Sequence, residues 1–267
     1  MKKVFLMAVT TAALLFAQGA KAQTNLQIFY DFSSDRQHVT TTLEGFYNDN
    51  WGNTFFFIDY DFNGKTATNQ NVTPSGTYFE IARCLNFWQN SALGGLSLQV
   101  EYNGGLCFDN PQLLDGSYTG WGINHSFLAG FDYFIHSADF NNTFNIKVLY
   151  KKILGTTQQV PLQFTLVWGF QDLFGVKGLR FSGFADFWWQ DHTVLYDHNF
   201  KKDGRIPNIL PETSRVVFIS EPQLWYNIGQ HFGCDNLNIG GEIELSYDFA
   251  TAKGFWCRPC AGIKWVF

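Results

Sequence analysis

The chain has 267 residues, of which 18% are aromatic and only 15% charged, and its formal net charge is −5. With a mean hydropathy of −0.11, this composition is unusual for a soluble enzyme and ordinary for a β-barrel with an apolar outside and a polar inside. The negative charge argues against nucleic acid as a partner. The sequence contains no phosphate-binding loop, dinucleotide fingerprint or zinc-protease motif. We therefore predict no cofactor and no enzymatic activity.

Residues 1–22 have the form of a secretory signal peptide. Lys2 and Lys3 form the basic start, residues 4–17 the apolar core, and Ala-Lys-Ala at 20–22 the cleavage site. We expect cleavage after Ala22, which leaves 23–267 as one outer-membrane β-barrel domain. Loss of Lys2, Lys3 and Lys21 changes the formal charge from −5 to −8. No later stretch approaches the roughly 18–20 apolar residues of a membrane-spanning helix.

The rest of the chain alternates apolar and polar residues with a period of two. Between Leu237 and Phe249, the odd positions carry Leu, Ile, Gly, Ile, Leu, Tyr and Phe, while the even positions carry Asn, Gly, Glu, Glu, Ser and Asp. This alternation is typical of strands with two different faces. It recurs in segments near the 9–11 residues that cross a bilayer when tilted. We predict twelve strands, at 24–32, 38–47, 53–62, 77–88, 96–107, 121–135, 142–152, 161–171, 178–190, 215–228, 237–249 and 257–267.

The connections between these strands fall into two sets. Those after even-numbered strands are short, whereas those after odd-numbered strands are mostly longer, notably 63–76, 108–120 and 191–214. Short periplasmic turns and long outer loops are the asymmetry of bacterial outer-membrane barrels. An even number of strands also places both termini on one side. The predicted fold class is therefore all-β: a transmembrane antiparallel β-barrel of about 12 strands, located in the outer membrane.

The alternation also assigns residues to the inside of the barrel. A Lys or Arg on the lipid face near the bilayer centre costs about 2–4 kcal/mol, so charged residues must face inward. Inward acids outnumber inward bases. These charged residues either line a path for solutes or pair with one another across the lumen. Inward aromatic rings either fill the barrel or provide stacking surfaces, worth roughly 1–3 kcal/mol per base in nucleic-acid complexes. The predicted pore-lining residues are Glu44, Phe57, Asp59, Asp61, Glu80, Glu101, Lys147, Arg180, Phe184, Asp186, Trp188, Glu221, Trp225, Glu242, Glu244 and Lys264.

Cysteine, histidine and tryptophan residues complete the inventory. The C-x-x-C motif 257–260 has no second pair to complete a zinc site, so we interpret the cysteines as packing residues with at most one loop disulfide. His192 and His198 lie near three aspartates, an arrangement that is more often solvated than metal-binding. We predict no metal site. Tryptophans near strand ends are expected to form interfacial girdles: Trp51, Trp88, Trp121, Trp168, Trp189, Trp256 and Trp265.

Three stretches are distinctive: Leu43-Glu44-Gly45-Phe46 with Trp51 and the run from Phe55 to Asp61; Phe79-Glu80-Ile81; and the run from Gly183 to Phe187. They resemble, in matching order, the second and third, the fourth and the ninth strands of the Tsx-like nucleoside-specific channels of bacterial outer membranes. The chain departs from that family in its loops and in its last strand, 262–267. The resemblance implies a monomeric twelve-stranded barrel and a nucleoside as the solute.

The leading hypothesis is a passive outer-membrane channel for small polar solutes. The alternative is a non-conducting surface barrel whose outer loops bind a partner or fold inward as a lid. An outer-membrane enzyme is a distant third, because His125 and Ser126 are adjacent in a strand and point to opposite faces. The expected partners are outer-membrane lipid, a small polar solute, and the barrel-assembly machinery through the strand ending at Phe267.

Overall fold

The computed structural model describes residues 21–62, 74–109, 119–199 and 209–267. The predicted signal peptide, except for Lys21 and Ala22, and much of the three long outer connections lie outside these ranges. The strands are β1 (Lys21–Asp31), β2 (Val39–Asp49), β3 (Gly52–Phe62), β4 (Pro74–Leu85), β5 (Leu96–Asp109), β6 (Thr119–His136), β7 (Asn142–Ile153), β8 (Leu162–Gln171), β9 (Leu179–Val194), β10 (Glu212–Ser220), β11 (Gln223–Tyr226), β12 (Leu237–Tyr247) and β13 (Phe255–Val266). Two short 3-10 turns, η1 (Leu173–Gly175) and η2 (Ile228–His231), sit in connections.

β10 and β11 together occupy one strand position, so the barrel has twelve. Both pair with β9 on one side and with β12 on the other, and the register is continuous across the gap. The interruption falls at Glu221 and Pro222, where proline has no N–H to donate to the ladder. Opposite the gap, Gly183 has φ +155°, and a Cβ there would approach the Glu221 carbonyl oxygen to 2.4 Å. The predicted strand 215–228 is confirmed as this interrupted pair.

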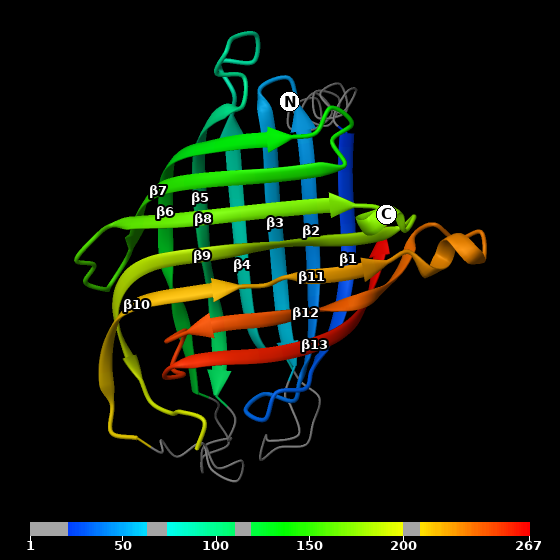
Figure 1. Cartoon of the computed structure of the whole chain (residues 1–267). Helices are drawn as coiled ribbons and strands as arrows, with labels where there is room; N and C mark the ends of the chain where they lie inside the picture. The colour runs from blue at the N-terminus through cyan, green and yellow to red at the C-terminus, as the bar shows by residue number, and fades with distance from the viewer. Residues whose placement is uncertain (1–20, 63–73, 110–118, 200–208) are drawn as a thin grey trace, which may run out of the picture.

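Every strand is antiparallel to its neighbours, and the sheet closes on itself. β1 pairs with β13 from Asn25↔Val266 to Asp31↔Cys260, which leaves no free edge. In Figure 1 the front wall of β7–β13 crosses the back wall of β1–β5 at a steep angle. Closure satisfies the backbone groups that lipid cannot. The predicted class, an all-β antiparallel barrel of twelve strands, is confirmed.

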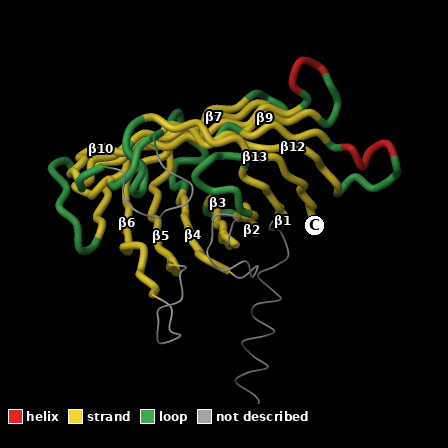
Figure 2. The backbone as a smooth tube through the Cα atoms, turned by 90° about the horizontal axis from the view of Figure 1, so that it is seen from below, coloured by secondary structure: helices red, strands yellow, loops and turns green. Residues whose placement is uncertain are grey.

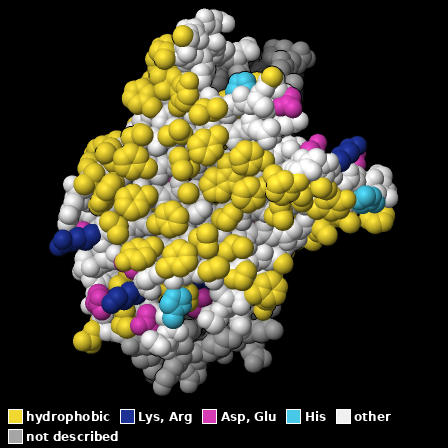
Figure 3. Space-filling view, viewed as in Figure 1, with side chains coloured by type: hydrophobic (Ala, Val, Ile, Leu, Met, Phe, Trp, Pro, Cys, Tyr) yellow, Lys and Arg dark blue, Asp and Glu magenta, His cyan; other side chains and the backbone are white. Residues whose placement is uncertain are grey.

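The outside of the barrel is apolar. On β5, Val100 is 53% exposed, whereas its neighbour Gln99 is 1% exposed. The same alternation on the other strands leaves large exposed side chains such as Leu26, Phe131 and Ile146 on the outer surface. Figure 3 shows apolar side chains as a broad field over the front strands, with charged groups gathered at its margins. Such a band is typical of the lipid-facing surface of a transmembrane barrel.

No helix in the described ranges has the length and apolarity needed to cross a membrane.

The two ends of the barrel differ. One end carries the tight β2–β3 turn, the β4–β5, β6–β7, β8–β9 and β11–β12 connections, and the C-terminus; we call it the turn end. The other carries the connections after β1, β3, β5, β7, β9 and β12, and we call it the loop end. Figure 2 views the molecule from below Figure 1, the side on which the β1–β2 loop lies. The predicted boundary after 190 is wrong: β9 continues to Val194, so His192 belongs to a strand.

Candidate functional site

The lumen of the barrel is the candidate site, and every predicted lining residue lies on its inner wall. Directly opposed residues on neighbouring strands share a face. Examples are the pairs Glu44↔Phe57, Asp132↔Lys147 and Thr165↔Asp186. Through such pairs, the inward orientation of a residue on one strand gives the inward residues of the next strand around the barrel. The inner wall is therefore polar and charged along most of its circumference, and the outer wall is not.

Much of this wall is packed. Gln27, Gln99 and Trp225 are each 1% exposed, and Leu149 is fully buried. Near the loop end, an apolar cluster of Ile153, Trp188, Val217 and Ile219 is joined by Phe184 and Phe249. The Lys151 ammonium lies 3.9 Å from the centre of a Trp188 ring, and the Trp188 indole donates to Gln190 Oε1 at 3.0 Å. In this arrangement a cation covers the Trp188 ring.

A second packed region spans the middle of β4–β7. Lys147 Nζ donates to Gln99 Oε1 at 2.9 Å and lies 3.9 Å from an Asp132 carboxylate oxygen. Gln99 also donates to Glu101 Oε2 at 2.8 Å. Cys84 Sγ lies 3.4 Å from Asp132 Oδ2. Acids and bases on this side of the lumen therefore satisfy one another.

The third region is an ionic network at the loop end, which we call the clasp. It consists of Arg258, Glu244, Asp35, Arg36 and Asp31. The Arg258 guanidinium donates to Asp35 Oδ2 at 2.8 Å and to Glu244 Oε1 at 2.6 Å. Arg36 contacts Glu244 at 2.6 Å and Asp31 at 3.6 Å. The clasp therefore ties the β1–β2 loop, which carries Asp35 and Arg36, to the inner wall formed by β12 and β13.

The ion pair between Arg258 and Asp35 at the centre of the clasp is buried. The Arg258 and Asp35 side chains are each 1% exposed. Burial opposes ionisation of Asp35, but the hydrogen bonds and charge of Arg258 outweigh it and lower the pKa of that carboxyl. Burial likewise disfavours the charged form of Arg36, and the carboxylates of Glu244 and Asp31 reverse this and raise its pKa. Both groups of the loop are therefore held in their charged forms.

Two more loops close over the clasp. Tyr196, from the β9–β10 connection, donates its hydroxyl to Asp35 at 3.2 Å and packs edge-on against Trp256. Burial raises the pKa of Tyr196 to about 12. The backbone of the same connection bonds the β12–β13 loop, where Lys253 N donates to Tyr196 O at 2.7 Å. Three loops thus meet over the lumen at this end.

The half-buried part of the inner wall follows β2–β4 and β10–β12. Its carboxylates outnumber its cations: Arg258, Lys151 and Lys264 are at most 9% exposed, Lys147 is half-buried, and Arg180 is exposed near the turn end. The Phe57 and Tyr78 rings lie 5.8 Å apart on the same wall. We call the following half-buried carboxylates the acidic strip: Glu44, Asp59, Asp61, Glu80, Glu221 and Glu242.

Near the turn end, an aromatic pair packs on the inner wall. Trp225 lies 5.5 Å from Phe29, ring centre to ring centre, and Lys264 Nζ lies 4.2 Å from the centre of a Trp225 ring. Lys264 is within electrostatic range of Glu44 and Glu242. Trp225 is thus packed between an aromatic ring and a cation.

Sequence reasoning missed part of the site. Arg258 is inward by the same alternation that identified Lys264, six residues later, so its position was readable from the sequence. No sequence pattern places Asp35 and Arg36 inside the barrel, because loop residues do not alternate with a period of two. The prediction that Trp256 belongs to a girdle is wrong: it is 4% exposed, and the Arg258 guanidinium lies 4.5 Å from its ring centre.

The cysteine and histidine motifs have structural explanations. Cys257 and Cys260 are three residues apart in a strand, so their side chains point to opposite faces, and all five cysteines are free. His192 interacts with the Asp248 carbonyl and His198 with that of Phe255. Within the described ranges, no three His, Cys, Asp or Glu side chains are arranged to hold a metal ion.

A closed twelve-stranded barrel with an apolar exterior and a charged lumen defines the class: a transmembrane β-barrel. The family described as a domain of unknown function (DUF5020) matches residues 23–267, and the chain belongs to it. A search of curated protein sequences returned no match.

Solved outer-membrane proteins are similar at low identity. The NanC porin matches at 8% identity, with 90% of this chain and 97% of that chain covered and a TM-score of 0.48. The KdgM porin in complex with disordered oligogalacturonate matches at 8% identity, with 92% and 99% covered and a TM-score of 0.44. The outer membrane channel DcaP of Acinetobacter baumannii matches at 11% identity, with 94% and 98% covered and a TM-score of 0.40. At these scores the matches carry no information about a substrate.

Proposed function

We propose that the protein is a passive channel of the bacterial outer membrane for small polar solutes, with no enzymatic activity. The observation that carries this proposal is the charged inner wall inside an apolar outer wall. A barrel that served only as an anchor has no need of so many inward carboxylates, whose desolvation is costly. The proposal includes export with cleavage after Ala22, insertion as a monomer, and recognition by the barrel-assembly machinery of the strand ending at Phe267.

The acidic strip gives the channel its charge preference. Half-buried carboxylates raise the local concentration of cations and repel anions. The cations of the inner wall that would offset them are mostly packed: Arg258 binds two carboxylates, Lys151 covers Trp188 and Lys264 covers Trp225. We therefore infer that the channel prefers cations and neutral solutes over anions.

Nucleosides are the specific solutes that the resemblance to Tsx-like channels suggests. The wall around Phe57 and Tyr78 supports this choice, because half-buried rings stand beside the Asp59 and Glu80 carboxylates. A ring can stack on a base, and a carboxylate can accept hydrogen bonds from ribose hydroxyls. This wall suits stacking better than Trp188 and Phe184, which are engaged in the apolar cluster.

The clasp favours a second candidate, a barrel that is closed at rest. Arg258 holds the β1–β2 loop against the inner wall, and the β9–β10 and β12–β13 loops cover it. A barrel that never opens, and that presents its loops to a partner, has the same static structure. The distinction is functional and rests on whether the barrel carries current.

Single-channel recording in planar bilayers tests these proposals. We expect brief, small openings, a reversal potential in a KCl gradient that shows preference for K⁺, and block by adenosine or thymidine but not by a neutral sugar. Current that no nucleoside blocks would remove the nucleoside proposal and keep the channel. No current from correctly folded protein, at any voltage, would favour the non-conducting barrel.

A further inference from the structure

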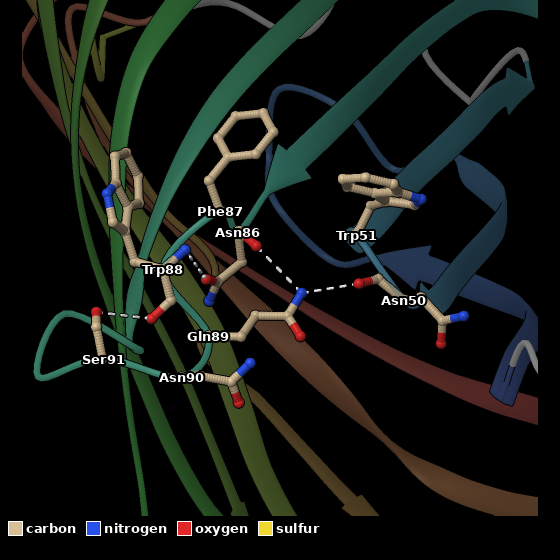
Figure 4. Close-up of a pocket in the computed structure, with 8 residues that line it drawn as sticks. All are labelled: Asn50, Trp51, Asn86, Phe87, Trp88, Gln89, Asn90 and Ser91. Atoms are coloured by element: carbon tan, nitrogen blue, oxygen red, sulfur yellow. Dashed lines mark hydrogen bonds between the residues drawn. The ribbon is translucent and has the colours of Figure 1, made fainter.

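A pocket at the turn end lies outside the lumen and is used by no part of the proposed channel. It encloses about 540 Å³ and is lined by Asn50, Trp51, Asn86, Phe87, Trp88, Gln89, Asn90 and Ser91. These residues come from two adjacent connections, β2–β3 and β4–β5. Figure 4 shows Trp51 and Trp88 on opposite sides of the pocket, with Phe87 and Gln89 between them.

Two of the three aromatic side chains of this pocket are open to solvent. Trp51 is 63% exposed and Phe87 is 55% exposed. Phe87 meets Trp88 edge-on at 6.1 Å, and Trp51 has no ring partner among the described residues. An open indole face carries negative quadrupole charge, which attracts the polarised C–H groups on one face of a saturated ring. Exposed rings in a concave site are therefore stacking surfaces.

The polar lining of the pocket is uncharged. It consists of amides and one hydroxyl, without an acid or a base. In the described structure, the side-chain amides of Asn50 and Asn90 form no hydrogen bond. A free amide offers both donors and an acceptor, which complements hydroxyl and acetamido groups. A charged ligand would find no counter-charge here.

The pocket is held in shape by its own hydrogen bonds. Gln89 Nε2 bridges the two connections, donating to the Asn50 carbonyl at 2.8 Å and to the Asn86 carbonyl at 3.1 Å. Asn86 N donates to Trp51 O at 2.8 Å. At Gly52, φ is +145° and a Cβ would lie 2.2 Å from the Cys84 carbonyl oxygen, so this close approach requires glycine. A preformed site lowers the cost of binding.

We propose that this pocket binds a neutral, N-acetylated sugar unit of a glycan chain. The open indole supplies the stacking face, and the free amides pair with the acetamido and hydroxyl groups. The turn end of an outer-membrane barrel faces the periplasm, which places the pocket where it can meet glycan on the inner side of the membrane. The proposal does not depend on conduction through the lumen.

The competing explanation is that these rings are interfacial anchors in lipid headgroups. Saturation-transfer NMR on the full chain in detergent separates the two. The probes are triacetylchitotriose, which carries acetamido groups, and maltotriose, which does not. We expect transfer from the protein to the acetamido methyl groups, and much weaker transfer to maltotriose.

The decisive variant is Trp51→Ala, with Phe174→Ala as the matched control. Phe174 is 90% exposed in the β8–β9 connection of the same end and is not one of the residues that line the pocket. Trp51→Ala should weaken chitotriose binding about fivefold or more, while Phe174→Ala leaves it unchanged and both proteins remain heat-modifiable on gels. Absence of transfer in the wild type, or equal affinity of Trp51→Ala and wild type, would overturn the proposal. Equal binding of both sugars would refute the acetamido preference.

Discussion

Replacement of Arg258 by alanine is the sharpest test of the clasp. Arg258 donates to the Asp35 and Glu244 carboxylates and to Ser246, and its side chain is 1% exposed. Removal of one partner from a buried ion pair costs about 3–5 kcal/mol, because the remaining charges stay buried without compensation. The closed position of the β1–β2 loop should lose most of this free energy, since Asp35 can regain water only by leaving the lumen.

The expected effect on gating follows from that magnitude. A loss of about 3–5 kcal/mol from the closed state raises the ratio of open to closed channels by roughly two to four powers of ten. Single-channel recording at low voltage should therefore show Arg258→Ala mostly open where the wild type is mostly closed. Asp35→Asn, which changes only the loop, should act in the same direction with a smaller magnitude.

Lys253→Ala is the matched control for this experiment. Lys253 and Glu212 form an ion pair at 2.7 Å at the same end of the barrel, but the two side chains are 41% and 52% exposed. Solvent screens exposed ion pairs, which therefore contribute little, so open probability should change little. If Arg258→Ala and Asp35→Asn fold and show the same open probability as Lys253→Ala, the clasp does not control access to the lumen.

Three further outcomes can be checked. Burial lowers the pKa of His38 in the β1–β2 loop below its ordinary value of 6.5, although Asp61 opposes this. His38 therefore binds a proton more readily when the loop is open than when it is closed. As pH falls below about 6.5, protonation weakens closure and the open probability should rise. His38→Asn should remove this rise. Glu80→Gln with Glu242→Gln should shift the KCl reversal potential toward zero; an unchanged value would exclude the acidic strip from selectivity. Ile28→Lys, on the outer face, should destabilise the barrel by about 2–4 kcal/mol in lipid refolding titrations, and a neutral effect would contradict the assigned lipid face.

The wall of the barrel could be predicted because one rule governs it. Lipid disfavours charged residues on the outer face near the bilayer centre, so alternation alone predicts that Asp186 on β9 and Lys264 on β13 face the lumen. Strand number followed from the same pattern, and even the interruption at Pro222 falls within a predicted strand. Each of these assignments depends only on neighbours along the chain or on the adjacent strand.

Contacts between strands that are not direct neighbours could not be predicted in the same way. The cation–π contact of Lys151 with Trp188 joins β7 to β9, and the contact of Phe29 with Trp225 joins β1 to β11. Such contacts depend on the cross-section of the barrel, which a period of two does not contain. The bond between Asp35 and Arg258 spans 223 residues and starts in a loop. Nothing in the local sequence distinguishes an inserted loop from a solvated one.

The lumen is filled by apolar packing in one region and by ion pairs in another, and this difference bears on function. Around Trp188, apolar side chains pack against one another and exclude water at little electrostatic cost. At the clasp, buried charged side chains fill the lumen instead. Replacing a buried ion pair by well-packed apolar residues often leaves a protein equally stable or more stable. An apolar plug is difficult to reopen in water, because opening exposes apolar surface. Charged groups regain hydration when they separate, so the ionic clasp is the part of the filling that suits reversible opening.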